Sequence, residues 1–182
     1  IPTAIETARK LREAGHAERF IWTTGSWLIY EYLEQGNPKQ RKQLEAAIEA
    51  GDIVWHGLPF TTHTELMTVS LFKYGLSLSQ QLDKRFGKKT IAAKMTDVPG
   101  HTRGIIPLLV EAGIQFIHLG ANAASTPPDV PPVFVWRDEA SQTGVNVMYQ
   151  RGGYGGIIRV PKLAHTLAFA HTNDNHGAQS LE

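Results

Sequence analysis

The feature that most constrains this chain is the alternation of helix-like and strand-like segments along it. Apolar residues recur at helical spacing in five segments, at 3–15, 26–33, 38–50, 65–86 and 103–112. Short apolar runs suggest strands at 20–22, 53–55, 90–95, 115–119, 133–136, 145–149 and 167–170. Repeated strand–helix alternation predicts an α/β fold with a parallel sheet and covering helices. An open doubly wound sheet and a section of a (β/α) barrel fit the pattern equally well, and the sixth strand could run antiparallel to the fifth.

Length and composition narrow the class of protein. The 182 residues suit a single domain spanning 1–182, and 42% apolar with 19% charged residues is an ordinary globular balance. The net charge of +1 comes from scattered basic residues, so we expect no nucleic-acid partner. The absence of cysteine excludes disulfides and thiolate zinc sites. No apolar run reaches the roughly 18 residues of a membrane span, so no membrane partner is expected, and the compartment is not indicated.

The beginning of the chain differs from that of a typical complete protein. It starts with Ile1-Pro2-Thr3, without an initiator methionine or a signal-peptide pattern. We therefore expect it to be a piece of a longer protein or to begin at a processed end.

Chemically useful side chains follow several predicted strands, where parallel α/β folds place their functional groups. Asp97 ends the third predicted strand within Asp97-Val98-Pro99-Gly100-His101-Thr102. A carboxylate at this place needs a partner, a hydrogen bond or a metal ion. Because His101 and Thr102 would open the next helix, its N-terminal amides would favour an anion. Asp97 is the main catalytic candidate, with simple capping of that helix as the alternative, and His101 is a further catalytic candidate.

Other candidates follow the remaining strands. His63 and Glu65 could bind metal or substrate, or could be ordinary polar residues of a surface loop. The segment 171–176 contains Asp174, a candidate catalytic carboxyl, and His176, a candidate metal ligand, but it could also be a frayed terminus. Trp27 is the best candidate of the four tryptophans for stacking on a sugar ring.

The glycine-rich stretch 152–156 predicts a flexible loop. It lacks the strand–GxxxxGK[ST]–helix context of a phosphate loop, and we take its Tyr154 as a substrate-binding candidate. The sequence contains neither a serine nucleophile elbow nor an HExxH helix.

The segment 94–102, Lys-Met-Thr-Asp-Val-Pro-Gly-His-Thr, resembles the α-mannosidases of glycoside hydrolase family thirty-eight. Their signature is a strand that ends in Asp-Pro-Phe-Gly-His-Ser, so Asp97, Gly100, His101 and Thr102 match or nearly match, while Val98-Pro99 departs from Pro-Phe. Segments at 49–57, 63–65, 108–120 and 134–137 are similar in the same order. The resemblance is loose and covers roughly residues 20–137, as in a divergent relative.

The resemblance implies a zinc-dependent retaining glycosidase on a seven-stranded (β/α) barrel, acting on an α-mannoside-like carbohydrate. Asp97 would be both nucleophile and zinc ligand, and His176 a further ligand. The family's His-x-Asp pair on the first strand has no equivalent here, so the resemblance fits a fragment that lacks this strand. An incomplete barrel exposes sheet edges, which would allow a homo-oligomer.

Two alternatives to the glycosidase remain. One is a metal-dependent carbohydrate deacetylase on the related barrel, with His63, Asp97 and His101 as ligands. The other is a non-catalytic domain that keeps the fold and binds carbohydrate or a partner.

Overall fold

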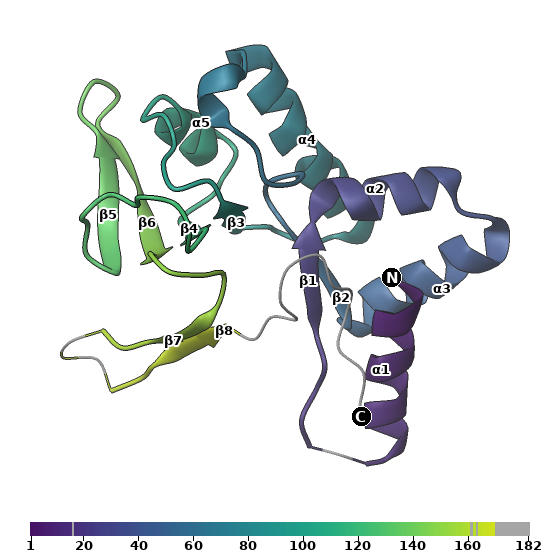
Figure 1. The fold of residues 1–182 in the computed structure, drawn as a ribbon. Coiled ribbons are helices and arrows are strands. Elements are labelled where there is room, and N and C mark those ends of the chain that lie inside the picture. The colour runs from purple at the N-terminus through teal and green to yellow at the C-terminus, as the bar shows by residue number, and fades with distance from the viewer. Residues whose placement is uncertain (16, 161, 163, 170–182) are drawn as a thin grey trace.

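A computed structural model describes residues 1–15, 17–160, 162 and 164–169 of the chain (Figure 1). The α-helices are α1 (Pro2–Glu13), α2 (Ser26–Gln35), α3 (Pro38–Ala50), α4 (Val69–Phe86) and α5 (Ile105–Glu111), and η1 (Thr64–Leu66) is a 3-10 helix. The strands are β1 (Trp22–Gly25), β2 (Ile53–His56), β3 (Ala92–Asp97), β4 (Phe116–Ala121), β5 (Val133–Asp138), β6 (Thr143–Gln150), β7 (Gly156–Ile158) and β8 (Leu167–Phe169).

The strands form three sheets rather than a closed barrel in the described part of the chain. β1 and β2 form a parallel pair, and the main sheet has the order β3-β4-β6-β5. In the main sheet β3, β4 and β6 are parallel, while β5 is antiparallel to β6, as the sequence suggested. A backbone hydrogen bond of 2.9 Å from Gly57 N to Ala92 O joins the end of β2 to β3. The third sheet is the antiparallel pair β7-β8.

Local capping signals set the N-terminal boundaries of α3 and α4. Asn37 caps α3 through a reciprocal capping box with Gln40, and Gly51 ends the helix at φ +77°. The expected helix over 65–86 is instead η1 followed by α4. The separation arises at Thr68, which has an extended backbone and whose hydroxyl accepts a hydrogen bond from Leu71 N at 3.2 Å.

Two other boundaries also differ from expectation. The first strand was placed at 20–22 because those residues are apolar, but β1 runs over Trp22–Gly25 because Thr23 and Thr24 pair with Val54 and Trp55. The helix expected at 103–112 is the shorter α5, which begins at Ile105.

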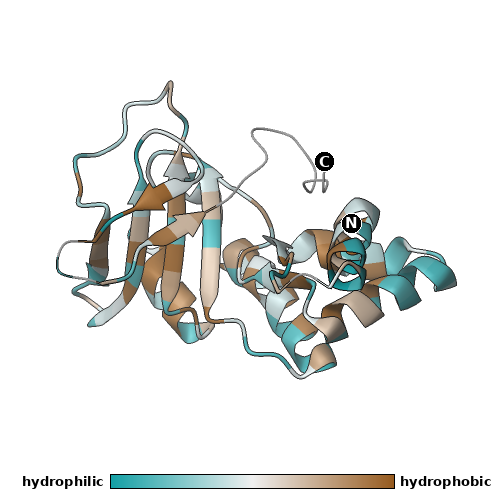
Figure 2. Ribbon diagram, turned by 90° about the horizontal axis from the view of Figure 1, so that it is seen from below, coloured by the Kyte–Doolittle hydropathy of each residue, from teal (hydrophilic) through white to brown (hydrophobic). Residues whose placement is uncertain are grey.

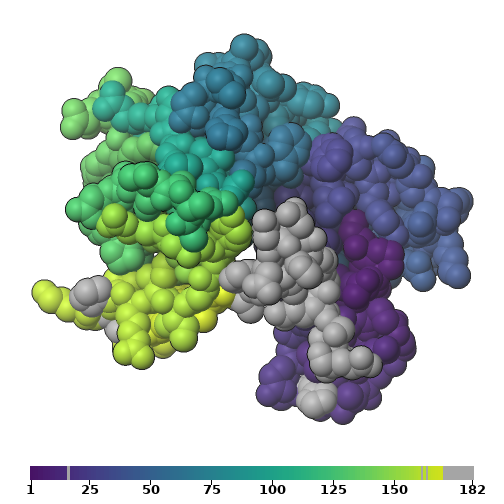
Figure 3. Space-filling view, in the orientation of Figure 1, coloured from purple at the N-terminus to yellow at the C-terminus, as the bar shows by residue number. Residues whose placement is uncertain are grey.

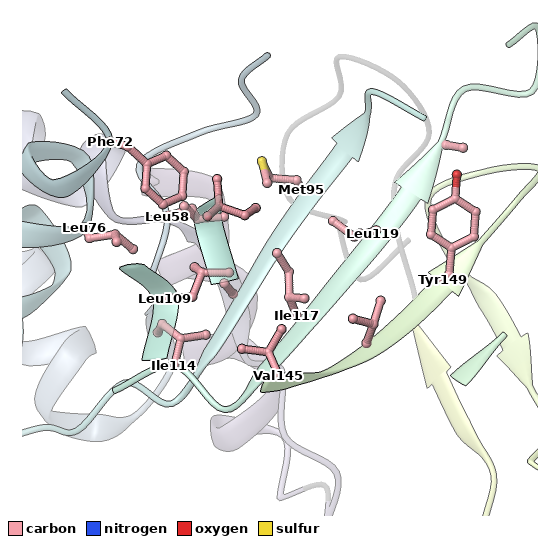
Figure 4. Packing of buried hydrophobic residues seen from close by; sticks show 14 residues of the cluster. Leu58, Phe72, Leu76, Met95, Leu109, Ile114, Ile117, Leu119, Val145 and Tyr149 are labelled. Atoms are coloured by element: carbon pink, nitrogen blue, oxygen red, sulfur yellow. The ribbon is translucent and has the colours of Figure 1, made fainter. Parts of the chain in front are cut away.

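One face of the main sheet packs against α4 and α5 (Figure 4). Alternate residues of the strands point to this face, and those that join its apolar cluster are Ala93, Met95, Ile117, Leu119, Ala121, Val145, Val147 and Tyr149. Phe72 and Leu76 of α4 and Leu109 of α5 meet them from the helix side. The strands of the sheet are accordingly rich in hydrophobic residues (Figure 2).

A second apolar cluster holds the N-terminal part together. Its buried members come from α1, α2, α3, β2 and α4, and they include Ile29, Leu44, Ile48, Ile53 and Trp55. Leu82 of α4 belongs to this cluster, so α4 contributes to both cores. In Figure 3 the N-terminal helices and the β5–β8 region lie on opposite sides of the molecule. None of the helices in the described ranges is long and apolar enough to cross a membrane.

Candidate functional site

Asp97 ends β3 in an unusual backbone conformation. Its φ of +81° lies in the left-handed region, which a non-glycine residue adopts only at a cost. Regular alternation after Met95 would place Asp97 on the helix-covered face, yet its side chain is exposed and contacts Tyr154 of the opposite side. The positive φ therefore accompanies a change in direction of the side chain at the end of the strand.

Two donors hold one oxygen of this carboxylate. Asp97 Oδ1 accepts hydrogen bonds from Asn122 Nδ2 at 2.8 Å and from Tyr154 Oη at 2.7 Å. The bond from Asn122, followed by that from Tyr154, lowers the pKa of Asp97 below its usual value. The carboxylate is thus ionised at neutral pH and reaches solvent.

Gly120 allows the glycine-rich loop to bring Tyr154 to this place. A Cβ at Gly120 would lie 2.7 Å from Gly153 O and 3.0 Å from the Tyr154 Cα, so a side chain would push the loop away from β4. The predicted loop at 152–156 is confirmed up to Gly156, where β7 begins. The loop brings Tyr154 into contact with Asp97, which is where a substrate-binding tyrosine would have to lie.

His101 lies in the loop between β3 and α5, and not at a helix N-terminus as expected. Its Nδ1 lies 3.4 Å from Thr64 Oγ1, which also accepts a hydrogen bond from Thr102 N at 3.0 Å. Burial lowers the pKa of His101 to about 4, so the imidazole is neutral near pH 7. Its Nε2 is buried and has no hydrogen-bond partner in the described part of the chain.

His63 and Glu65 flank the buried Thr64 and are themselves exposed. The charge of His63 acts on both Asp97 and His101, lowering the pKa of each, while that of Glu65 raises the pKa of His101. Thr61 fixes the preceding loop to β3, because its hydroxyl accepts a hydrogen bond from Thr96 N at 3.2 Å. The structure therefore brings both candidates into the neighbourhood of the Asp97 loop.

Trp27 lies near the start of α2 and is 43% exposed. Phe60, which sequence reasoning did not select, is 50% exposed and packs edge-to-face against it with ring centroids 6.0 Å apart. Trp55 is buried and Trp22 packs partly buried against the N-terminal core, as expected for tryptophans within strands. Trp27 thus keeps an accessible aromatic surface.

A second polar group was missed because its members lie within strands. Lys94 of β3 and His118 of β4 face each other across the register, with Nζ and Nδ1 2.8 Å apart. His118 Nε2 lies 2.6 Å from Gln150 Oε1, and Lys94 Nζ donates to Tyr154 O at 3.0 Å. All lie on the sheet face opposite the helices. The signal available in the sequence was their alternation with Ala93, Met95, Ile117 and Leu119.

The residues proposed to bind zinc do not assemble into a complete site in the described ranges. No three histidine, aspartate or glutamate side chains there are grouped so that they could hold a metal ion. Asp174 and His176 lie outside the described residues. Of the two proposed zinc ligands, the described residues therefore contain Asp97 alone.

Comparisons with known proteins give a structural likeness without a family. No family model matches, and no curated protein matches either. A 4-alpha-glucanotransferase from Thermococcus litoralis is similar with a TM-score of 0.56 and 12% identity over 80% of this chain and 23% of that chain. An alpha-mannosidase from Enterococcus faecalis V583 is similar with a TM-score of 0.62 and 13% identity over 82% of this chain and 17% of that chain. The chain thus spans about a fifth of each enzyme's length, and it shares with them a mixed α/β fold of mostly parallel strands.

Proposed function

We propose that this chain is part of the catalytic region of a retaining glycoside hydrolase that acts on an α-mannoside-like carbohydrate. The observation that carries the proposal is the exposed, ionised Asp97, held by Asn122 and Tyr154 at the carboxyl end of β3. The fold likeness to two carbohydrate-active enzymes, one of them an alpha-mannosidase, supports it. So does the match of Asp97, Gly100 and His101 to the family motif described above.

Asp97 has the properties that a glycosidic nucleophile needs. Its Oδ1 is anchored by two donors, which leaves Oδ2 to attack the anomeric carbon. As the new C–O bond forms, the glycosidic bond breaks and the leaving oxygen takes a proton from a second carboxyl group. Water then releases the sugar from Asp97, and the anomeric configuration is retained.

The second carboxyl group must lie about 5 Å from the first in a retaining enzyme. Glu65 is the candidate within the described residues, because it follows the loop that contacts the Asp97 segment and its charge reaches His101. Asp174 is the other candidate and lies outside the described residues. With Glu65 in this role, the substrate would bind between the η1 loop and the end of β3.

Trp27 and Tyr154 are the proposed carbohydrate contacts. The accessible Trp27 ring, braced by Phe60, offers an apolar face on which a sugar ring can stack. Tyr154 Oη already bonds Asp97 and would lie beside a sugar hydroxyl near the attacked carbon. His63 would add a polar contact from the adjoining loop.

Zinc remains part of this proposal, with Asp97 and His176 as ligands. A bound zinc ion would orient sugar hydroxyls next to the nucleophile. The deacetylase alternative needs His63, Asp97 and His101 to converge on one ion. The described part of the chain argues against it, because no three histidine, aspartate or glutamate side chains there are grouped so that they could hold a metal ion.

The test is covalent trapping of the nucleophile. The full-length protein that carries these residues is incubated with a fluorinated mannosyl fluoride that forms a slow-hydrolysing glycosyl-enzyme, and the labelled peptide is found by mass spectrometry. We expect the label on Asp97 and a retained anomer when product formation from an aryl α-mannoside is followed by NMR.

Two variants control this experiment. Asp97→Asn should remove the label, whereas Glu111→Gln, at an exposed carboxylate paired with Lys73, should leave it unchanged. A label on another carboxylate, or an inverted product, would refute the assignment of Asp97. Zinc content measured on the same samples tests the metal part separately.

A further inference from the structure

Three polar side chains on the face of the main sheet opposite the helices form a series of hydrogen bonds that ends at the glycine-rich loop. Gln150 Oε1 can only accept, so its 2.6 Å contact requires that His118 Nε2 carry the proton. His118 Nδ1 therefore accepts a hydrogen bond from Lys94 Nζ at 2.8 Å. Lys94 Nζ in turn donates to the backbone carbonyl oxygen of Tyr154 at 3.0 Å.

The imidazole in the middle of this series is held on several sides. His118 is 1% exposed, and the Phe169 ring stacks on it with centroids 4.3 Å apart and 13° between planes. Lys94 and His118 are direct partners in the register of β3 and β4, and Lys94 Nζ lies 5.5 Å from the centre of the same phenyl ring. Because His118 is stacked and bonded at both ring nitrogens, it restricts where the Lys94 amine can lie.

The bond from Lys94 to the loop is of the stronger, charge-assisted kind. Burial lowers the pKa of Lys94 to about 8, so most of the amine still carries its charge at pH 7. Within the residues described, no carboxylate forms an ion pair with it. The charged amine therefore directs its hydrogen bonds to neutral acceptors, and one of these is the carbonyl oxygen of Tyr154.

The loop that receives this bond has little of its own to fix its conformation. Tyr154 is the one residue of the sequence between 152 and 156 that is not glycine, and a glycine backbone is conformationally permissive. The loop also passes so close to β4 that a Cβ at Gly120 would lie 2.7 Å from Gly153 O. The place of the Tyr154 backbone is thus set by its contacts with β3 and β4.

We propose that Lys94, held by His118 and Gln150, is a positioning residue for the glycosidase reaction proposed above. It acts through Tyr154, which is bonded at both ends, by its carbonyl oxygen to Lys94 and by its hydroxyl to Asp97 Oδ1. Fixing the carbonyl fixes the point from which the hydroxyl reaches the nucleophile, and so leaves Oδ2 directed at the substrate. The inference rests on the function proposed for Asp97.

The kinetic test is a double-mutant cycle on the full-length protein. Lys94→Met keeps an unbranched side chain but removes the donor, so turnover of an aryl α-mannoside should fall about three- to tenfold. In the Tyr154→Phe background the same substitution should cost less than about twofold, because the hydroxyl through which Lys94 acts is already absent. Equal losses in the two backgrounds would overturn the proposal.

A spectroscopic test needs no turnover. The tyrosines of the full chain are labelled at Cζ with an NMR-active carbon isotope, and Tyr154→Phe identifies the resonance of Tyr154. In Lys94→Met this resonance should move toward that of Tyr74, which is 60% exposed, because the hydroxyl exchanges Asp97 for solvent. Lys42→Met, at an exposed lysine of α3, is the matched control and should leave the resonance and the turnover unchanged.

An unchanged Tyr154 resonance in a folded Lys94→Met chain would overturn the positioning role. Gln150→Leu replaces that variant if it does not fold, because it removes the acceptor of His118 and leaves Lys94 in place. The resonance should then move in the same direction by a smaller amount, and a folded Gln150→Leu chain without any movement would also overturn the proposal. An unsubstituted protein without mannoside turnover, in which the Tyr154 resonance still responds to Lys94→Met, would refute the proposed function and support the positioning of Tyr154 by Lys94.

Discussion

The two faces of the main sheet use the same strands for different purposes. Toward α4 and α5, each strand presents aliphatic side chains that are almost fully buried, such as Ile117 and Val147. Toward the other side, the residues next to them in sequence are Lys94, His118 and Asn146. The comparison shows that the alternation of side chains along these strands separates two kinds of contact, since the first set packs into the apolar core and the second forms hydrogen bonds.

Asp97 is the exception to this division, and its backbone explains why. The left-handed conformation at the end of β3 releases the residue from the alternation and lets it join the tyrosine that Lys94 also contacts. Tyr154 therefore connects the two polar groups, through its hydroxyl to Asp97 and through its carbonyl to Lys94. The following predictions test whether substitutions on the polar face affect activity while substitutions on the helix-covered face affect stability.

The largest effect is expected at Asp97 itself. Asp97→Asn keeps a side chain that tolerates a positive φ and can still bond Tyr154, but it removes the nucleophile, so turnover should fall by about a thousandfold or more. Hydrolysis of an aryl α-mannoside measures the loss, and thermal unfolding should show little change. Turnover close to that of the unsubstituted protein would contradict the role of Asp97.

The next effect is a difference in unfolding free energy between substitutions on the two faces of the main sheet. Ile117→Ala leaves a cavity at a fully buried position in the centre of the sheet and should cost about 2–5 kcal/mol of unfolding free energy. Asn146→Ala, at an exposed position of β6, loses one hydrogen bond to Gln115 O and should cost about 1 kcal/mol or less. Urea unfolding gives both values, and equal costs would remove the distinction.

A smaller effect tests the connection through Tyr154. Tyr154→Phe removes one donor to Asp97 Oδ1, so the pKa of Asp97 should rise toward its usual value and turnover should fall about tenfold. The acid limb of the pH–rate profile should move to higher pH, because the carboxylate must be ionised to attack. An acid limb at the same pH as in the unsubstituted protein would show that the hydrogen bond from Tyr154 does not influence the pKa of Asp97.

The smallest effect is a pH dependence of stability caused by Lys94. Its pKa of about 8 in the folded chain is below the ordinary value of 10.5, so the unfolded chain binds more protons between these pH values and stability should rise as pH increases through that window. In Lys94→Met this contribution is absent, and its melting temperature should rise less from pH 8 to pH 10. Parallel melting curves for the two proteins over this range would contradict the depressed pKa.

The sequence predicted the α/β class and the position of most elements because their apolar periodicity is strong. The helix at 38–50 and the antiparallel pairing of the strands at 133–136 and 145–149 were both confirmed. The break at Thr68 was not foreseen, since a threonine within an apolar helical pattern does not reveal that its hydroxyl will cap the next helix. The short β7 was also missed, because glycine-rich sequence before it indicates a loop.

Only part of the candidate site could be predicted from the sequence, because some of its residues depend on contacts between distant segments. Position after a strand identified Asp97, which the structure joins to Asn122 by a hydrogen bond. Phe60 and Lys94 were not selected, because their importance depends on contacts with residues distant in sequence, such as Trp27 and His118. Sequence position indicates the end of a strand, whereas the register that aligns Lys94 with His118 is a property of the folded sheet.

The division of α4 between the two apolar clusters has a consequence for how the molecule opens. Phe72 and Leu76 are anchored in one core and Leu82 in the other, so each half of the helix is protected by a different partner. In a native-state hydrogen-exchange experiment, the amides of one helix should therefore separate into two cooperative groups with different opening free energies. The first turns of α4 would exchange together with the main sheet, and the last turn with the N-terminal helices, making this helix the boundary between two folding units.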